Sequence, residues 1–214
     1  MKFKREPQLP YPQPWEWIRD NIEFEDQELF FVDVGAHDGI SSSNTGYFEI
    51  DLGWDGICIE PNSLVFDKLK ENRNCKLYNC CAGSENKEVD FLLITGYAEM
   101  LSGIYSEYHK NHLTRIDNEI INNGGKKELI KVKSYPLKEI LKENNVKKID
   151  YLSIDVENAE MEVLKGINFS EVDIRVISIE NCEYNDNAKK YLIDNGYQWI
   201  HKCCSDDIFI KKYE

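Results

Sequence analysis

This sequence of 214 residues is short of basic charge: 26 Lys and Arg stand against 39 Asp and Glu, a net charge of −13. Non-specific binding to nucleic acids depends on Lys and Arg side chains that neutralise phosphates. The composition therefore disfavours a nucleic-acid partner and favours a substrate that is neutral or cationic.

Paired cysteines are also lacking. The seven cysteines are an odd number, and no two of them form a C-x-x-C pair. Structural zinc sites commonly use such pairs, and disulfide frameworks of small secreted proteins use an even number. We therefore expect reduced thiols, no structural zinc and a cytoplasmic protein.

Long apolar runs are absent as well. No stretch reaches the ~18 apolar residues of a membrane-spanning helix, so we expect no membrane insertion. Residues 1–14 are polar and rich in proline, without the apolar core of a signal peptide. The length and the 42% hydrophobic content predict one globular domain over residues 29–214. Residues 1–28 are expected to form a lead-in with a short helix that Trp15 and Trp17 pack onto the domain.

The most informative stretch that is present is FFVDVGAHDG, residues 30–39. Its β-branched, apolar start ends abruptly at Asp33 and is followed by Gly35 and Gly39. This pattern predicts a buried strand, a tight turn and then a helix. The glycines are expected to let the backbone approach a ligand, and the helix N-terminus would offer amide donors.

A second strand is predicted over residues 56–60 and ends in Glu60. A carboxylate about 20 residues after a glycine-rich turn can accept both ribose hydroxyls of an adenosyl group. An ordinary strand, turn and helix with a surface acid would explain either feature alone. The two together favour a nucleoside ligand.

The glycine spacing helps to distinguish a dinucleotide from other nucleoside ligands. A dinucleotide site uses G-x-G-x-x-G, so that a pyrophosphate can lie on the helix N-terminus. This chain has only two glycines here, and Asp33 and Asp38 stand beside them. An anion repels a pyrophosphate but attracts the ammonium and sulfonium groups of S-adenosylmethionine (SAM). The turn therefore favours SAM over NAD.

Strands and helices are predicted to alternate along the chain. Strands are expected at 29–34, 56–60, 76–82, 88–95, 129–134, 149–155, 174–179, 197–202 and 207–212, and helices near 43–52, 62–72, 136–141, 158–165 and 188–194. This alternation predicts a parallel sheet with helices on both faces, which binds ligands at the carboxyl ends of its strands. Residues 96–125 lack clear periodicity and are expected to form a lid or binding loop.

Several blocks resemble one known family. They are FVDVGAHDG followed by SSSNT, then LGWDGICIEPN, NR at 72–73, LSIDVENAEMEVLKG, VISIEN and DDIFIKK. With these blocks, residues 30–212 resemble the FkbM-type family of SAM-dependent methyltransferases. The resemblance implies an α/β, Rossmann-like class I methyltransferase fold. In that fold, a mostly parallel seven-stranded sheet has helices on both faces and ends in an antiparallel hairpin. The resemblance also implies methyl transfer from SAM, usually to a hydroxyl oxygen of a sugar or a secondary metabolite.

The resemblance also implies a set of cofactor-binding residues, which includes a covering loop near Ser102. The expected set is Asp33, Gly35, Ala36, His37, Asp38, Gly39, Asn44, Glu60, Pro61, Ala82, Ser102 and Asp155. The chain departs from the family at the fourth core strand, where a lysine commonly precedes the aspartate and a glycine follows the glutamate. Ser153 and Asn158 occupy those positions here, so no substrate role of that lysine carries over.

Methyl transfer to an alcohol needs a group that removes the hydroxyl proton. Candidates for this base are Asp155, Glu157, Glu180, His37 and His109. We expect Asp155, Glu180 and His109 to be the catalytic residues, and Asp155 is best placed, at a strand end. His109 could instead be a surface histidine. His37 could instead support the backbone of the turn. Glu157 and Glu160 could instead cap the start of the helix near 158, where negative charge is favourable.

A metal hypothesis comes from the same strand ends. Asp155 ends one strand, and the pair Glu180 and Asn181 ends the next, which gives an all-oxygen set suited to Mg²⁺ or another divalent cation. Metal-dependent O-methyltransferases of the catechol type carry a similar set. The alternative is that Glu180 and Asn181 bind substrate or backbone without a metal.

The acceptor is expected to bind against loops 96–125 and 181–188, where tyrosines could stack on a sugar ring: Tyr97, Tyr105, Tyr108 and Tyr184. We expect O-methylation of a sugar or glycan hydroxyl, with a small-molecule or glycan acceptor as the partner. Alternatives are O-methylation of another small metabolite, and a non-catalytic SAM-fold binding module. The four strand-end acids Asp33, Glu60, Asp155 and Glu180 argue against the non-catalytic module.

Overall fold

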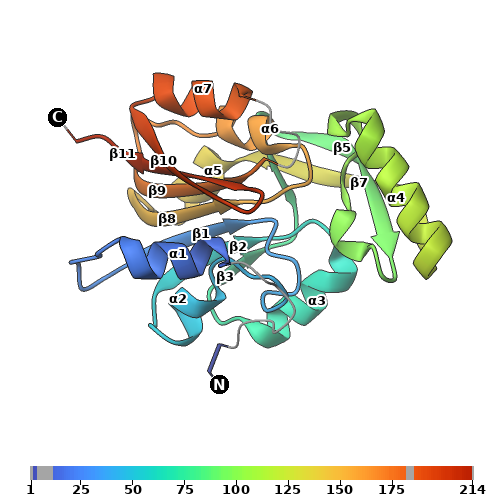
Figure 1. Ribbon diagram of the computed structural model, residues 1–214, viewed down its shortest axis with the longest axis horizontal. Helices are drawn as coiled ribbons and strands as arrows, with labels where there is room; N and C mark the ends of the chain where they lie inside the picture. Colours follow the sequence, from blue (N-terminus) through green and yellow to red (C-terminus); the bar gives the residue numbers. More distant parts are fainter. Residues whose placement is uncertain (1, 4–11, 182–185, 214) are drawn as a thin grey trace.

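The structure, a computed structural model, describes residues 2–3, 12–181 and 186–213. Its centre is a seven-stranded sheet of order β10-β11-β9-β8-β1-β2-β3 (Figure 1). The strands are β1 (Phe30–Val34), β2 (Asp55–Ile59), β3 (Lys76–Tyr78), β8 (Lys148–Ile154), β9 (Asp173–Glu180), β10 (Tyr197–Cys203) and β11 (Asp206–Lys211). Neighbours pair in parallel, except that β11 is antiparallel to both β9 and β10. The predicted fold class is confirmed.

The central strands are apolar on both faces. In β1, Phe31 and Val32 are both fully buried, but they belong to hydrophobic clusters on opposite sides of the sheet. Tyr151 and Leu152 of β8 divide in the same way. Side chains alternate along a strand, so continuous apolar runs of this kind require cover on both faces.

Helices provide that cover (Figure 1). On one face, the core includes residues of α5 (Leu137–Glu143), α6 (Glu160–Lys165) and α7 (Asn187–Asp194). On the other, it includes residues of α1 (Pro14–Asn21), α2 (Gly46–Ile50) and α3 (Ser63–Asn72). Trp15 of α1 is buried and stacks on Tyr47, with ring centroids 4.8 Å apart, so the lead-in helix packs on the domain as expected.

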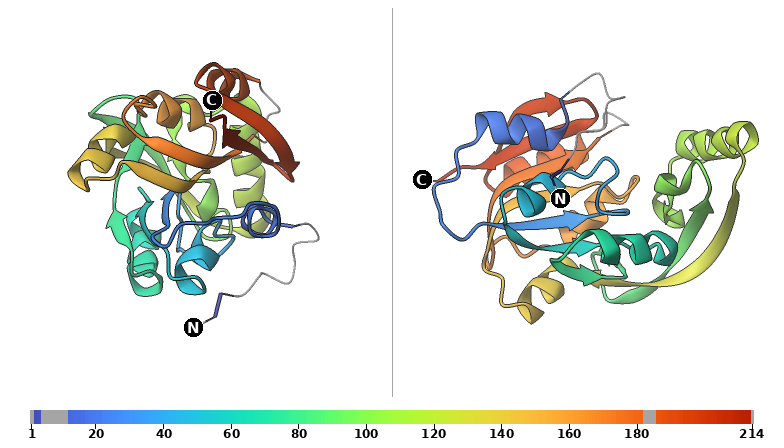
Figure 2. Two further views of the ribbon diagram at one scale, coloured as in Figure 1. Left: turned by 90° about the vertical axis from the view of Figure 1, so that its left-hand side faces the viewer. Right: turned by 90° about the horizontal axis from the view of Figure 1, so that it is seen from below.

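A second sheet of four strands has the order β4-β7-β5-β6. Its strands are β4 (Cys81–Gly83), β5 (Lys87–Thr95), β6 (Gly103–Ile104) and β7 (Lys126–Pro136). The right-hand view of Figure 2 shows β5 and β7 curving away from the main body, with α4 (Lys110–Asn123) at the end of this arm. Ile116 of α4 packs with Ile94 of β5 in the same hydrophobic cluster.

Two predicted elements are corrected. Residues 76–82 do not form one strand, because β3 and β4 belong to different sheets. The stretch 96–125 is not a loop throughout: it contains the 14 residues of α4, the 3₁₀ helices η1 (Glu99–Leu101) and η2 (Tyr105–Glu107), and β6. Leu113, Ile116 and Ile120 of α4 have the spacing of one helix face and pack in a single cluster, so the lack of clear periodicity that the sequence analysis assigned to this stretch is wrong.

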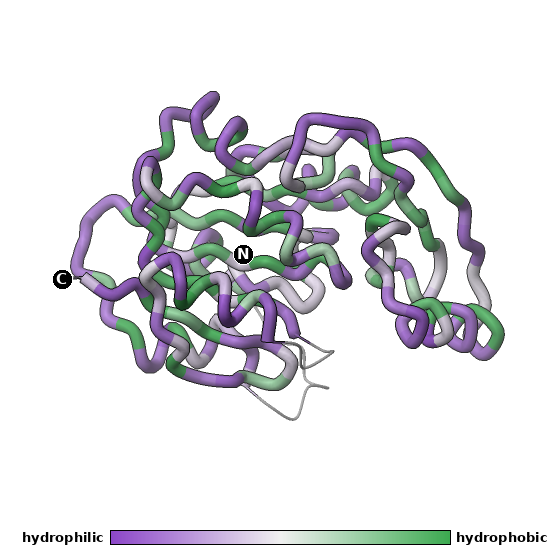
Figure 3. The backbone as a smooth tube through the Cα atoms, turned by 90° about the horizontal axis from the view of Figure 1, so that it is seen from above, coloured by the Kyte–Doolittle hydropathy of each residue, from purple (hydrophilic) through white to green (hydrophobic). Residues whose placement is uncertain are grey.

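Figure 3 shows hydrophobic residues concentrated along strands in the middle of the molecule. No helix in the described ranges has the length and apolar character that a membrane crossing needs. The six cysteines that the structure describes are unpaired, while Cys182 lies outside the described residues.

Candidate active site

A cavity of about 490 Å³ lies at the carboxyl ends of the parallel strands, the edge at which the sequence predicts ligand binding. Most of the expected cofactor-binding residues line it. These are Asp33, Gly35, Ala36, His37, Asn44, Glu60, Pro61, Ala82, Ser102 and Asp155. Asp38 and Gly39 are not among the residues that line it, although both belong to the predicted glycine-rich motif.

The two glycines of the motif make room for protein atoms. Gly35 has φ +90°, and a Cβ there would lie 1.7 Å from the backbone oxygen of Asp155. Gly39 has φ +79°, and a Cβ would lie 2.5 Å from Cγ of Arg73. Gly35 lines the cavity, as the sequence predicts, whereas Gly39 does not. They let the turn after β1 pack against the end of β8 and against Arg73.

Arg73 is a buried cation that the sequence analysis gave no role, although it belongs to the quoted NR pair. Its guanidinium donates to Glu49 Oε2 at 2.5 Å, Thr45 Oγ1 at 2.9 Å and the Gly39 oxygen at 3.1 Å. Thr45 in turn donates to Asp33 Oδ2 at 2.6 Å. Burial raises the pKa of Asp33, and the charge of Arg73 and this hydrogen bond oppose the shift.

Asp38 holds the turn itself. Its carboxylate accepts from the amide of Ile40 at 2.9 Å and from the amide and hydroxyl of Ser41 at 2.7 and 2.8 Å. Burial acts to raise the pKa of Asp38, but the neighbouring His37 and the hydrogen bonds from Ile40 and Ser41 outweigh burial and lower the pKa well below its usual value. The structure gives Asp38 a role in the turn and does not place it against the cavity.

Glu60 lies in the cavity wall with only 6% of its surface exposed. Its Oε1 accepts from the amide of Asn62 at 2.7 Å, and its Oε2 accepts from the amide of His37 at 2.9 Å. Burial raises the pKa of Glu60 to about 7, against these two bonds. The carboxylate is therefore fixed in position by the backbone on either side of it.

Three further residues of the cavity wall differ in whether their polar atoms already have hydrogen-bond partners. Asn44 Oδ1 is buried and, within the described part of the chain, has no hydrogen-bond partner. The hydroxyl of Ser102 donates to the Glu99 oxygen at 2.7 Å and accepts from the Ile94 amide at 3.0 Å, so it holds the covering loop to β5. The His37 amide supports Glu60, which fits the backbone-supporting alternative for this histidine.

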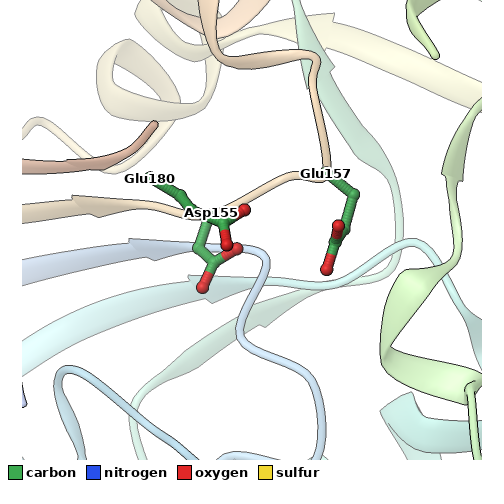
Figure 4. Close-up of side chains that lie close together, drawn as sticks. All are labelled: Asp155, Glu157 and Glu180. Carbon is green, nitrogen blue, oxygen red and sulfur yellow. The ribbon is translucent and has the colours of Figure 1, made fainter. Parts of the chain in front are cut away.

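A group of acids, here called the carboxylate cluster, consists of Asp155, Glu157 and Glu180. One carboxylate oxygen from each lies within 4.8 Å of the others. Figure 4 shows Asp155 and Glu180 at the ends of neighbouring strands and Glu157 on the loop that follows. Burial and the charge of Glu180 raise the pKa of Asp155 well above its usual value. Burial and the charge of Asp155 do the same for Glu157.

The loop conformation explains why Glu157 joins the cluster. Glu157 and Asn158 have φ of +55° and +82°, so the chain reverses there. Asn158 stands where the resembling family commonly has glycine, and asparagine adopts this left-handed conformation more readily than most residues. Glu160 lies in the first turn of α6 and accepts from the Asn158 amide of the preceding loop at 3.1 Å. The N-cap is Ala159, without a side-chain cap bond, so Glu160 supports the loop and not the cap, while Glu157 lines the cavity.

Two predicted residues are not brought to the cluster. Asn181 donates its side-chain amide to Asp207 Oδ2 at 2.8 Å and is not among the residues lining the cavity. His109 is exposed at the N-cap of α4 and does not line the cavity either. Of the expected metal set, the structure therefore assembles Asp155 and Glu180, with Glu157 in the place of Asn181.

Two residues that the sequence analysis missed lie beside the cluster. His112 is buried on α4, with its Nε2 3.2 Å from Glu157 Oε2, and its ring stacks on Tyr108. Burial and the nearby charge of Arg115 lower the pKa of His112 to about 4. Asp206, the first acid of DDIFIKK, lines the cavity and is 6% exposed. Only recognition of α4 as a helix would have drawn attention to His112.

The sheet order, the reversed β11 and the cavity at the strand ends define a class I methyltransferase fold. A family model described as the methyltransferase FkbM domain matches residues 33–204. The chain belongs to the FkbM methyltransferase family.

A solved structure of low sequence identity shares the fold. An FkbM methyltransferase from Methylobacillus flagellatus KT has a TM-score of 0.57 and 15% identity, with 93% of this chain and 48% of that chain covered. This chain therefore spans about half the length of that protein. A precorrin-6y C5,15-methyltransferase from Geobacter metallireducens GS-15 has a TM-score of 0.49 and 12% identity, with 98% and 95% covered. Among curated proteins, none matches this chain in sequence.

Proposed function

We propose that this protein transfers a methyl group from SAM to a hydroxyl oxygen of a sugar or glycan. The observation that carries the proposal is the presence, in one cavity, of the fixed carboxylate Glu60 and of the carboxylate cluster. Membership of the FkbM family supports methyl transfer as the reaction. The acceptor class rests on the composition of the cavity and its surroundings.

The residues of the cavity fit SAM. Each oxygen of Glu60 holds one backbone amide and keeps accepting capacity for one ribose hydroxyl. Asn44 Oδ1, buried at the cavity wall, would accept from a donor on the ligand. A volume of about 490 Å³ lies in the ordinary range for ligand pockets. When bound, SAM supplies an electrophilic methyl group on a sulfonium centre.

The carboxylate cluster supplies what an alcohol acceptor needs. A hydroxyl must lose its proton as the new bond forms, and carboxylates within hydrogen-bond reach can take it. Burial and mutual repulsion raise the pKa of Asp155, which makes its carboxylate a stronger base than an exposed one. Apolar residues of the loop after β5, Leu101 and Ile104, also line the cavity and exclude water from it.

A neutral, hydroxyl-rich acceptor suits the charge of the molecule. The net charge of −13 and the acids of the cavity wall would repel a phosphate group close to the reacting hydroxyl. Tyr97 and Tyr105 are exposed near the covering loop and could stack on a sugar ring. Tyr108 could not, because its ring stacks on His112 and its hydroxyl donates to the Leu101 oxygen. Tyr184 lies outside the described residues.

The test is methyl transfer from isotopically labelled SAM to a panel of neutral oligosaccharides, nucleotide sugars, glycan extracts and phenols, read by mass spectrometry. We expect label on a sugar oxygen, and much less label with Glu60→Ala at SAM concentrations just sufficient to saturate the wild type. Label on nitrogen or carbon would contradict hydroxyl transfer. Label only on phenols would keep methyl transfer and overturn the sugar assignment.

A further inference from the structure

We propose that the carboxylate cluster is a divalent-cation site, with Asp155, Glu157 and Glu180 as its protein ligands. This inference goes beyond the proposed function, because an ion can bind here whether or not a methyl group is transferred. It also differs from the set that the sequence suggests, since the Asn181 amide is bonded to Asp207.

The spacing of the oxygens suits an ion. The three carboxylates each offer one oxygen within 4.8 Å of the other two. Oxygens on opposite sides of an octahedral Mg²⁺ are about 4.2 Å apart, and those around Ca²⁺ are up to about 5 Å apart. Three oxygens at such separations can therefore share one cation. An all-oxygen set selects Mg²⁺, Mn²⁺ or Ca²⁺ over Zn²⁺ or Cu²⁺.

Electrostatics favours the same conclusion. Carboxylates crowded together in a largely buried site repel one another, and buried charge is costly unless it is compensated. Asp155 and Glu180 end neighbouring strands, and Glu157 follows on the loop, so three carboxylates meet at one place. A divalent cation bound between them would neutralise much of this charge.

A second, independent observation is the neighbouring Asp206. It pairs in register with Glu180 across β9 and β11, lines the same cavity and is 6% exposed. Its Oδ1 is buried without a hydrogen-bond partner in the described part of the chain. A buried, unpartnered carboxylate oxygen is unfavourable unless a ligand satisfies it. Water held by a cation in the cluster would donate to this oxygen.

The position of Glu157 is supported from outside the cluster. His112 Nε2 lies 3.2 Å from Glu157 Oε2, and the His112 ring is held by stacking on Tyr108 with centroids 5.0 Å apart. The two side chains are in contact, although His112 Nε2 has no hydrogen-bond partner among the described residues. The α4 arm therefore helps to build the proposed site, although it contributes none of its three ligands.

The experiment titrates Mn²⁺ into the full-length, chelator-treated protein without SAM or acceptor, and follows free Mn²⁺ by electron paramagnetic resonance. We expect one saturable site that Mg²⁺ competes for. Asp155→Asn and Glu157→Gln should each weaken binding at least ~10-fold, the lower bound for lost metal-site interactions. Asn181→Ala and the exposed Asp67→Asn serve as controls and should bind as the wild type does. Thermal melts of each variant verify that it is folded.

Absence of saturable Mn²⁺, Mg²⁺ or Ca²⁺ binding at millimolar concentrations would overturn the proposal. So would unchanged binding in a folded Asp155→Asn, Glu157→Gln double variant. Stabilisation of the metal-free protein by an amino sugar, with no response to metals, would assign the cluster to an organic cation instead. The titration contains neither SAM nor acceptor. Its result therefore does not depend on whether the methyl-transfer assay succeeds.

Discussion

At the scale of single residues, Gly35 shows how closely the turn after β1 fits its surroundings. A Cβ on Gly35 would lie 1.7 Å from the Asp155 backbone oxygen, whereas a Cβ on Gly53, also at positive φ, would meet nothing within 4 Å. Both positions use glycine for its left-handed backbone, but only one uses it for space. Comparing Gly35 with Gly53 therefore separates the cost of a left-handed backbone from the cost of a steric clash.

We predict that Gly53→Ala costs about 1–2 kcal/mol, the penalty of a left-handed alanine. Gly35→Ala should cost more than about 4 kcal/mol, because the clash with backbone adds to that penalty. Urea unfolding followed by circular dichroism measures both. Equal losses in the two variants would show that the contact with Asp155 is not tight.

The titration of Glu60 gives a pH prediction. Burial raises the pKa of Glu60 to about 7, so the folded, unliganded protein takes up a proton at this carboxylate as the pH falls from 8 to 6. The ionised form is the better acceptor for ribose hydroxyls. SAM affinity should therefore fall by up to about tenfold per pH unit below 7. Calorimetry from pH 6 to 8 tests this, and Glu60→Gln should flatten the profile. A flat profile in the wild type would contradict the assignment.

Asp155 is predicted to matter for turnover more than for cofactor binding. Asp155→Asn keeps the size of the side chain but removes the proton acceptor, so kcat should fall about 10²–10⁴-fold. The affinity for SAM should change little, because Glu60 and Asn44 lie elsewhere in the cavity wall. Steady-state rates and SAM calorimetry on the same preparation give both values. Near-normal turnover would make Asp155 structural.

At the scale of elements, the buried guanidinium of Arg73 joins the end of α3 to the turn after β1. It bonds Glu49, Thr45 and the Gly39 oxygen from a position that is itself buried. Removing one partner of a buried ion pair leaves the other charge uncompensated. Arg73 therefore holds the turn that carries much of the cavity wall.

We expect Arg73→Met to lower the free energy of unfolding by about 3–5 kcal/mol. Lys131→Met, which breaks the exposed pair with Asp90, should cost no more than about 1 kcal/mol. Denaturant titrations of the two variants make the comparison. A loss at Arg73 as small as that at Lys131 would refute the structural role.

The sequence predicts some elements better than others for physical reasons. The central strands and their terminal acids are predictable, because runs apolar on both faces occur mainly in covered parallel sheets. Helix α4 was missed although Leu113, Ile116 and Ile120 have helical spacing, because these residues pack on a small local cluster of the arm and stand among many polar residues. The position of Glu157 depends on the positive φ of Glu157 and Asn158, which non-glycine residues do not signal.

At the scale of the whole molecule, two parts of the fold converge on one cavity. The central sheet places Glu60, Asp155 and Glu180 along one edge, as a parallel arrangement predicts. The second sheet and α4 form an arm whose His112 reaches Glu157 from the other side. The end of the cavity at Glu60 could be predicted from local motifs, but the end at Glu157 depends on contacts between distant segments.

The central claim is that this cavity binds SAM through Glu60, and calorimetric titration of SAM into the wild type and Glu60→Ala tests it most directly. We predict a dissociation constant in the micromolar range or below for the wild type, with no binding of NAD. Glu60→Ala should lose about 1.5–3 kcal/mol, the worth of hydrogen bonds to a charged group. No binding of SAM by the wild type, or unchanged affinity in folded Glu60→Ala, would contradict the account.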